Sequence, residues 1–437
     1  MAMTAMRNGP RRAAAAMTRW AGSRLLSMAM TRRSGLAGVS VVPKKLSMPL
    51  RRDGLDPLPA LGELRDSQPV AKLRRMFGIN VWLVSGYEQA RAVLADTVNY
   101  SNDIRPFTGT DSSTAEGAIG GLGFTDPPEH TRLRALLTPE FTKRRLARLQ
   151  PSIERIVEER LDALAAGPPV VDLAAEFSFP IPFLVICELL GLEPADRDRF
   201  RELGGARFDL ADGINGTFDA MSESREFLLE VVRKQRLSPG DGLLGALLDS
   251  HGEAVDEVQL AGLADGVFTG GFETSASMLS LGTLTLMRDP DGFALIRKDD
   301  EAVDGVVEEL LRYLSVVQIA FPRFARRDLD LLGQQIKAGD VVVCSLSGAD
   351  RDPVFGVSAD HFDPRRAPQS HLAFGHGFHR CVGSELARME LRAAFRGLAR
   401  RFPDIALAVD PGELRFRKLS IVYGLDSLPV RLNERER

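Results

Sequence analysis

The chain has 437 residues, of which 44% are hydrophobic and 26% charged, a balance typical of a folded globular protein rather than a disordered, collagenous or coiled-coil chain. No run approaches the ~18 uninterrupted apolar residues of a membrane-spanning helix. Three cysteines are too few for a disulfide framework and indicate a reducing compartment.

Residues 1–52 form a basic leader with eleven Lys or Arg residues and no acid, so the rest of this chain of net charge −3 carries −14. An acidic body argues against a nucleic-acid-binding protein. Three interpretations of the leader stay open: a targeting or membrane-surface segment, a basic docking arm, or a flexible extension whose true start is Met28, Met30 or Met48. We assign it no chemistry.

From residue 53 to residue 437 the pattern predicts one domain of long helices with a few short strands, without an internal repeat or a linker. Apolar residues recur every three or four positions over 146–165 and 218–235, which predicts helices. Strand-like runs cover 81–84 and 341–346. The sequence therefore predicts a mainly α fold with small β-sheets.

A longer helix is predicted over about 260–287, and it contains the run Gly270-Gly271-Phe272-Glu273-Thr274. A glycine inside a helix costs about 1 kcal/mol relative to alanine. Two adjacent glycines therefore predict a local opening of the helix, where a ligand or water reaches the backbone.

The densest chemical signal is the segment 371–383, in which Cys381 directly precedes a helix predicted over 384–401. The dipole and free N–H groups of a helix start favour a thiolate, and the nearby glycines permit a tight turn. This pattern indicates a thiolate ligand. Cys187 and Cys344 lie in apolar runs and are predicted to be core residues.

Two alternatives use the same segment. His371, His376, His379 and Cys381 are residue types that bind zinc, although their spacing differs from that of the common zinc modules. A nucleophilic cysteine would require a general base and an oxyanion hole, and the segment alone shows neither.

The segment resembles the haem-binding loop of the cytochrome P450 family, Phe-Gly-x-Gly-x-His-x-Cys-x-Gly. Every fixed position is matched, by Phe374, Gly375, Gly377, His379, Cys381 and Gly383. Other family signatures follow in the right order: Glu309-Leu-Leu-Arg312 matches Glu-x-x-Arg, Arg366 is the expected third member of its charge network, and 270–274 resembles the family's central-helix motif.

The resemblance implies a single haem-thiolate monooxygenase fold that binds haem b, iron protoporphyrin IX, with Cys381 as the axial iron ligand and Phe374 and Gly375 in the surrounding loop. Glu273 and Thr274 would then be the acid and the alcohol that deliver protons to dioxygen. The alternative for Thr274 is a hydrogen bond back to a helix carbonyl.

Haem propionates are carboxylates that Arg and His side chains bind well. The run 126–134 resembles the family's Asp-Pro-Pro-x-His-x-x-x-Arg, which assigns His130 and Arg134 to the propionates. Arg323 and His379 are the other two residues that the resemblance assigns. Each of the four has the alternative of being a surface charge or a capping residue.

The function implied is insertion of one oxygen atom into an apolar small molecule, by hydroxylation or epoxidation, in secondary metabolism. No flavin or nicotinamide motif is evident, so electrons are expected from a separate ferredoxin and ferredoxin reductase. Their docking face would be a basic cluster, which could instead be solvated helix surface. Its members are Arg132, Arg134, Lys143, Arg144, Arg145 and Arg148.

We expect a soluble, cytoplasmic protein, with peripheral membrane association through the leader left open. A haem-thiolate sensor that never turns over is the alternative function. Substrate contacts would come from the family's variable segments, so the substrate itself is not predicted. Those segments are 100–123, 208–218, 267–269, 316–320 and 421–423.

Overall fold

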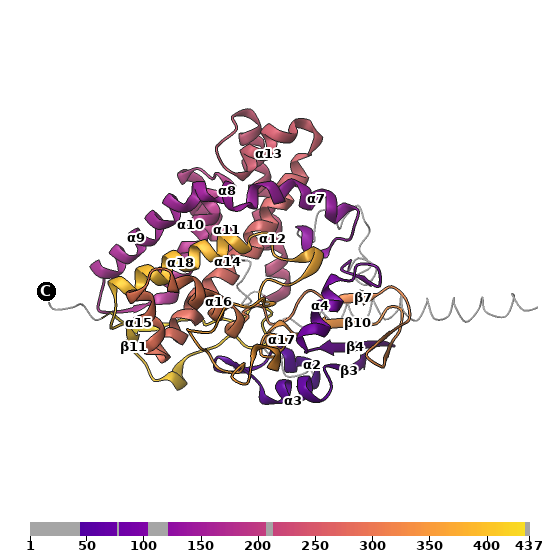
Figure 1. Ribbon diagram of the computed structural model, residues 1–437. Helices are drawn as coiled ribbons and strands as arrows, with labels where there is room; N and C mark the ends of the chain where they lie inside the picture. Colours follow the sequence, from indigo (N-terminus) through magenta and orange to yellow (C-terminus); the bar gives the residue numbers. More distant parts are fainter. Residues whose placement is uncertain (1–43, 77, 104–120, 207–212, 433–437) are drawn as a thin grey trace, which may run out of the picture.

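The computed structural model describes residues 44–76, 78–103, 121–206 and 213–432 (Figure 1). Residues 1–43 of the basic leader lie outside these ranges. The end of the leader contains helix α2, Lys44–Ser47, and Arg52 in strand β1, Arg52–Asp53. The Arg52 guanidinium donates hydrogen bonds to Gln318 Oε1 and to the Ser315 carbonyl, both at 2.9 Å. This part of the leader is therefore joined to the domain.

Helices dominate the described residues, as the sequence predicts. They are α3 Pro59–Ser67, α4 Tyr87–Ala95, α7 Glu129–Leu137, α8 Lys143–Leu146, α9 Gln150–Ala166, α10 Pro180–Leu190, α11 Pro194–Ala206, α12 Gly213–Leu237, α13 Leu243–His251, α14 Glu257–Arg288, α15 Pro290–Lys298, α16 Ala302–Leu314, α17 Leu346–Ala349 and α18 Ser384–Arg401, with short 3-10 turns such as η3 Gly121–Phe124 and η9 Gly377–His379.

The strands form four small sheets within the described ranges. The largest has the order β3-β4-β10-β7-β5, in which β4 and β10 are parallel and Val341 pairs with Val81. The strand-like run 81–84 is thus confirmed, whereas 341–346 is a strand only over 341–344, because Leu346 begins helix α17. The strands are β2 Asp56–Pro57, β3 Val70–Met76, β4 Ile79–Val84, β5 Tyr100–Ser101, β6 Val170–Asp172, β7 Arg323–Ala325, β8 Leu329–Leu331, β9 Gln334–Ile336, β10 Val341–Cys344, β11 Ala406–Leu407 and β12 Pro429–Arg431.

The long helix α14 runs through the helical part of the molecule and packs against α10, α12, α16 and α18 (Figure 1). The Asp256 carboxylate caps its start by accepting the Gln259 N–H at 2.8 Å. The helix ends before Asp289-Pro290, because a proline disfavours helical geometry in the residue before it.

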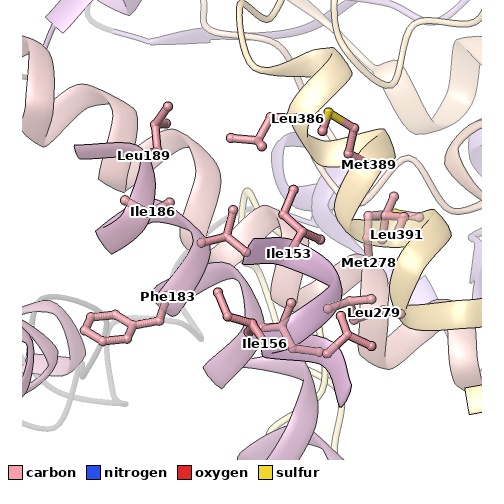
Figure 2. Packing of buried hydrophobic residues seen from close by; sticks show 14 of the residues in the cluster. Ile153, Ile156, Phe183, Ile186, Leu189, Met278, Leu279, Leu386, Met389 and Leu391 are labelled. Carbon is pink, nitrogen blue, oxygen red and sulfur yellow. The ribbon is translucent and has the colours of Figure 1, made fainter. Parts of the chain in front are cut away.

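The main hydrophobic core lies where α9, α10, α14 and α18 meet. Figure 2 shows Ile153 and Ile156 of α9, side chains of α10, and Met278 and Leu279 of α14 facing residues of α18. A second core cluster lies between the five-stranded sheet, α4 and α17. Cys187 belongs to the first cluster and Cys344 to the second, as predicted.

None of the helices in the described ranges is both long and apolar enough to cross a membrane.

Candidate functional site

The loop that carries Cys381 connects the second core cluster to α18. Gly375 and Gly377 have φ values of +68° and +72°, which L side chains rarely adopt. A Cβ atom on Gly377 would lie 2.7 Å from the Ala95 Cα atom of α4, so this position has room for glycine alone. The Cys381 N–H donates to the Phe374 carbonyl at 2.9 Å and closes the loop.

Cys381 is solvent-accessible, although protein atoms surround much of its sulfur. Burial raises the pKa of the thiol, and the Gly383 N–H together with Arg134, Arg380 and Arg388 opposes this rise. The backbone contribution predicted from the sequence is therefore present, but burial outweighs it. A metal ion at the sulfur would reverse the balance, because a coordinating thiol is deprotonated.

Four side chains predicted to hold propionates converge beside the loop. The His130 and His379 rings lie 4.3 Å apart, centroid to centroid. His130 is 1% exposed, and within the described residues neither of its ring nitrogens has a hydrogen-bond partner. Arg323 is 4% exposed and donates to the Phe321 carbonyl at 2.9 Å.

The electrostatics of this cluster favour an anion. Burial, followed by the charges of His130, Arg323 and Arg134, lowers the pKa of His379 to about 3. Burial also lowers the pKa values of His130, Arg134 and Arg323. Buried cations and unpartnered ring nitrogens are costly without an acceptor, so two carboxylates fit here. The chemistry of these residues therefore fits the two propionates of a haem.

The histidines of the zinc alternative point to different places. His371 Nε2 lies 3.2 Å from a carboxylate oxygen of Glu308, whereas His379 packs against His130. In the described part of the chain, no three His, Cys, Asp or Glu side chains gather to hold a metal ion.

Helix α14 runs unbroken through the paired glycines, so the local opening of the helix that they predict is not seen, but the surface of the helix is open there. Thr269 and Gly270 are exposed, whereas residues 275–286 are buried between neighbouring helices. The Thr274 hydroxyl donates to the Gly270 carbonyl at 2.8 Å, which is the back-bond considered as an alternative. The hydroxyl oxygen keeps acceptor capacity for a second partner.

Glu273 forms an ion pair with Arg417, a residue that follows it by 144 positions. Burial raises the pKa of the Glu273 carboxyl and Arg417 lowers it. The Arg417 guanidinium also lies 3.9 Å from Asp426. The acid is therefore held beside Thr274 by a partner that no local motif could indicate.

The predicted Glu-x-x-Arg network is confirmed. Arg312 donates to both oxygens of Glu309 at 2.8 Å, and each side chain is 2% exposed. Arg366 donates to Glu309 at 3.1 Å as the third member. Arg312 also donates to the carbonyls of Asp350 and Ala359, which ties α16 to the segment leading into the Cys381 loop.

Comparison with known proteins agrees with this geometry. A family model described as Cytochrome P450 matches residues 196–404. Cytochrome P450 FAS1 of Rhodococcoides fascians is 38% identical over 402 residues, which cover 90% of this chain and 100% of the relative. Cytochrome P450 monooxygenase PikC of Streptomyces venezuelae is 40% identical over 381 residues, 86% of this chain and 91% of PikC. The chain belongs to the cytochrome P450 family.

A solved relative supports the same fold. The structure of OxyC, a cytochrome P450 implicated in an oxidative C–C coupling reaction during vancomycin biosynthesis, has a TM-score of 0.79 and 37% identity, covering 87% of this chain and 96% of OxyC. As a member of the cytochrome P450 family, the present chain is a haem-thiolate monooxygenase, and its cofactor is iron protoporphyrin IX haem.

Several charged residues near the P450 site were not found from the sequence. Arg417, Glu308 and Arg388 acquire their roles through partners far away in the chain. Glu390 of α18 is a buried acid that interacts with Ser275, the residue after Thr274. Its second carboxylate oxygen has no hydrogen-bond partner among the described residues.

Proposed function

We propose that Cys381 is the axial ligand of the haem iron and that His130, Arg134, Arg323 and His379 bind the propionates. The observation that carries this proposal is the buried cluster of cationic and imidazole groups beside the Cys381 loop, whose His130 nitrogens lack partners in the described chain. Charge-assisted hydrogen bonds to two carboxylates would satisfy these groups.

When bound, haem supplies reductive activation of dioxygen, and a thiolate ligand favours cleavage of the O–O bond. The chain's own residues supply protons and exclude bulk water. The Thr274 hydroxyl, anchored on the Gly270 carbonyl, presents its free lone pair in the open part of α14. Glu273, whose pKa is raised by burial, resupplies the proton when its ion pair with Arg417 opens.

The substrate that we propose is an apolar small molecule of secondary metabolism. OxyC is implicated in an oxidative C–C coupling reaction during vancomycin biosynthesis. Its 37% identity to the present chain supports a role of this chain in secondary metabolism. Phe321 and Ile421 are large hydrophobic residues that are 45% and 51% exposed, and both lie in or next to variable segments. Thr269 is also exposed. Much of the other expected lining, in 104–120 and 208–212, lies outside the described residues.

The electrons would come from a separate ferredoxin and its reductase in the cytoplasm. Arg132, Lys143 and Arg144 are exposed on α7 and α8, and a positive face steers an acidic donor. Glu140 partly neutralises Arg145, at 2.8 Å, whereas Arg134 turns toward the Cys381 side. The docking face that we propose is therefore smaller than the cluster predicted from sequence.

The first test is the difference spectrum of the reduced protein with carbon monoxide, for wild type and for Cys381→Ser. We expect a strongly red-shifted Soret band in wild type and its loss in the variant. A spectrum of histidine-ligated haem in wild type would contradict the assignment of Cys381.

A second test supplies a bacterial ferredoxin, its reductase and NADPH, and measures electron consumption and oxygenated product for a panel of apolar natural products. We expect NADPH consumption to depend on substrate. Substrate binding without any substrate-dependent electron consumption would favour the sensor alternative instead.

A further inference from the structure

A second charge network lies under the Cys381 loop, next to the Glu-x-x-Arg network but separate from it. Glu308 on α16 accepts a hydrogen bond from Arg388 Nη2 of α18 at 2.9 Å and a second one from Arg388 Nε. The same carboxylate lies 3.2 Å from His371 Nε2. We call Glu308, Arg388 and His371 the Glu308 clamp.

The hydrogen bonds of the Glu308 clamp have a defined direction. The Ala373 N–H donates to His371 Nδ1 at 3.2 Å, so Nε2 carries the hydrogen that is donated to Glu308. Burial raises the pKa of Glu308, but the hydrogen bonds from Arg388 and His371 lower it to about 2. Glu308 is therefore an ionised acceptor that holds two groups at once.

Both groups held by Glu308 contact the Phe374 ring. The Arg388 Cζ atom lies 4.6 Å from the ring centroid, and the His371 ring centroid lies 6.0 Å from it. A guanidinium over an aromatic face is an attractive arrangement. Phe374 is also the residue whose carbonyl accepts the Cys381 N–H. The clamp therefore fixes the residue that fixes the backbone of Cys381.

We propose that the Glu308 clamp positions the Cys381 loop and that the Arg388 guanidinium, held over Phe374, favours electron uptake at the haem. This inference rests on the proposed ligation of the iron by Cys381. A fixed positive charge near the sulfur stabilises the reduced site, which holds one more electron. Glu308 attenuates that charge, so the two residues act with opposite signs. All three are positioning residues, because they act through Phe374 and through their charge.

The chain offers a matched control one helical turn away. Arg392 of α18 pairs with Asp304 of α16, with Arg392 Nε 2.6 Å from the Asp304 carboxylate. This pair joins the same two helices as Arg388 and Glu308, with both residues displaced by four positions. Arg392 also donates to Glu385 of α18 at 3.4 Å. It lies further along α18 from the Cys381 loop than Arg388 does, so its loss removes a charge of the same kind from the same two helices.

The experiment compares Arg388→Gln, Arg388→Lys, Glu308→Gln and Arg392→Gln as haem-loaded proteins. The readouts are the haem reduction potential, the red-shifted Soret band of the reduced carbon monoxide complex and its persistence, with far-UV circular dichroism as the folding control. We expect Arg388→Gln to lower the equilibrium constant for one-electron reduction of the haem about tenfold. This corresponds to a shift of the reduction potential by about 59 mV to a more negative value.

We expect Glu308→Gln to shift the reduction potential to a more positive value. Arg388→Lys should keep most of the wild-type potential but lose the red-shifted Soret band sooner. Arg392→Gln should have the same potential and the same band as wild type. Shifts of the same sign in Arg388→Gln and Glu308→Gln, or equal shifts in Arg388→Gln and Arg392→Gln, would overturn the inference. If Arg388→Gln does not load haem, the Lys and Glu308 variants decide the question. A wild type without the red-shifted band would refute the ligation by Cys381 itself.

Discussion

Two buried charge clusters of this P450 differ in how they are satisfied. In the Glu309–Arg312–Arg366 network, every group has partners within the protein, including both oxygens of Glu309. In the cluster of His130, Arg134, Arg323 and His379, cationic and imidazole groups face one another, and the pKa values of all four are lowered. Two members of each cluster are at most 4% exposed. The first cluster is complete, whereas in the second the ring nitrogens of His130 have no hydrogen-bond partner within the described residues.

We propose that this difference separates a structural site from a ligand-binding site. A protein tolerates buried charge when its own groups neutralise it. A buried group without a partner destabilises the fold, and it is retained where a ligand supplies the missing partner. Removing a member of the complete cluster should therefore reduce stability, whereas removing a member of the incomplete one should reduce ligand affinity.

The largest effect is expected for Arg312→Met, which leaves Glu309 buried with one partner fewer. Breaking a buried pair costs about 3–5 kcal/mol of unfolding free energy, measurable from the midpoint of urea unfolding. Glu159→Gln is the control, because Glu159 pairs with Arg155 at 2.9 Å on an exposed surface and should cost less than about 1 kcal/mol. Equal losses in the two variants would contradict a structural role for the buried network.

The same reasoning distinguishes two threonines of α14 that make identical bonds. Thr274 donates to Gly270 and Thr283 donates to Leu279, both at 2.8 Å, but Thr283 is buried and Thr274 lies in the open part of the helix. For Thr274→Ala we expect a loss of about 10²-fold in product formation per electron consumed. Thr274→Ser should restore it. Thr283→Ala should leave the ratio of product to NADPH unchanged, and a comparable fall there would count against proton delivery by Thr274.

His130→Ala tests the incomplete cluster directly. We expect haem to dissociate about tenfold faster, since one charge-assisted hydrogen bond contributes about 1.5–3 kcal/mol, while the urea midpoint of the haem-free protein does not fall. Transfer of haem to an excess of a scavenging globin measures the rate. Arg132→Ala, two residues along α7 and exposed, is the control, and equal release rates would exclude His130 from the propionate site.

An effect that depends on pH is expected at Glu390, an intermediate case with one partner, Ser275. Burial raises its pKa from 4.5 to about 8, so the folded state binds the proton more tightly than the unfolded state. Stability therefore falls as pH rises from about 4.5 to about 8. Glu390→Gln should remove this fall. The Tm of the variant minus that of wild type should therefore increase from pH 4.5 to about 8 and stay constant at higher pH. A pH-independent difference in Tm would contradict the raised pKa.

The sequence predicts the parts of the site that depend on neighbours in the chain. Glu309 and Arg312 share a helix face because they are three residues apart, and the loop from Phe374 to Gly383 contains its own turn and its own hydrogen bond. The helix predicted over 384–401 has those bounds in the structure. Local spacing was sufficient for these features because local contacts form them.

Other features depend on long-range packing and could not be predicted. Arg417 reaches Glu273 across 144 positions, and Arg388 reaches Glu308 across 80. With 56 Lys or Arg residues in the chain, no spacing selects the correct partner. The same holds for the pKa of Cys381, because its rise depends on how much protein surrounds the sulfur and not on the helix that follows it.

The close fit of Gly377 against α4 has a consequence for cooperativity. Leu372, at one end of the loop, belongs to the core cluster of the sheet, whereas Phe374 packs against the cluster of the helices. The turn at Gly377 lies against Leu94 and Ala95 of α4, and Leu94 belongs to the cluster of the sheet. The loop therefore contacts both hydrophobic cores. Melting of either core releases the loop, so the two cores are expected to unfold in a single transition.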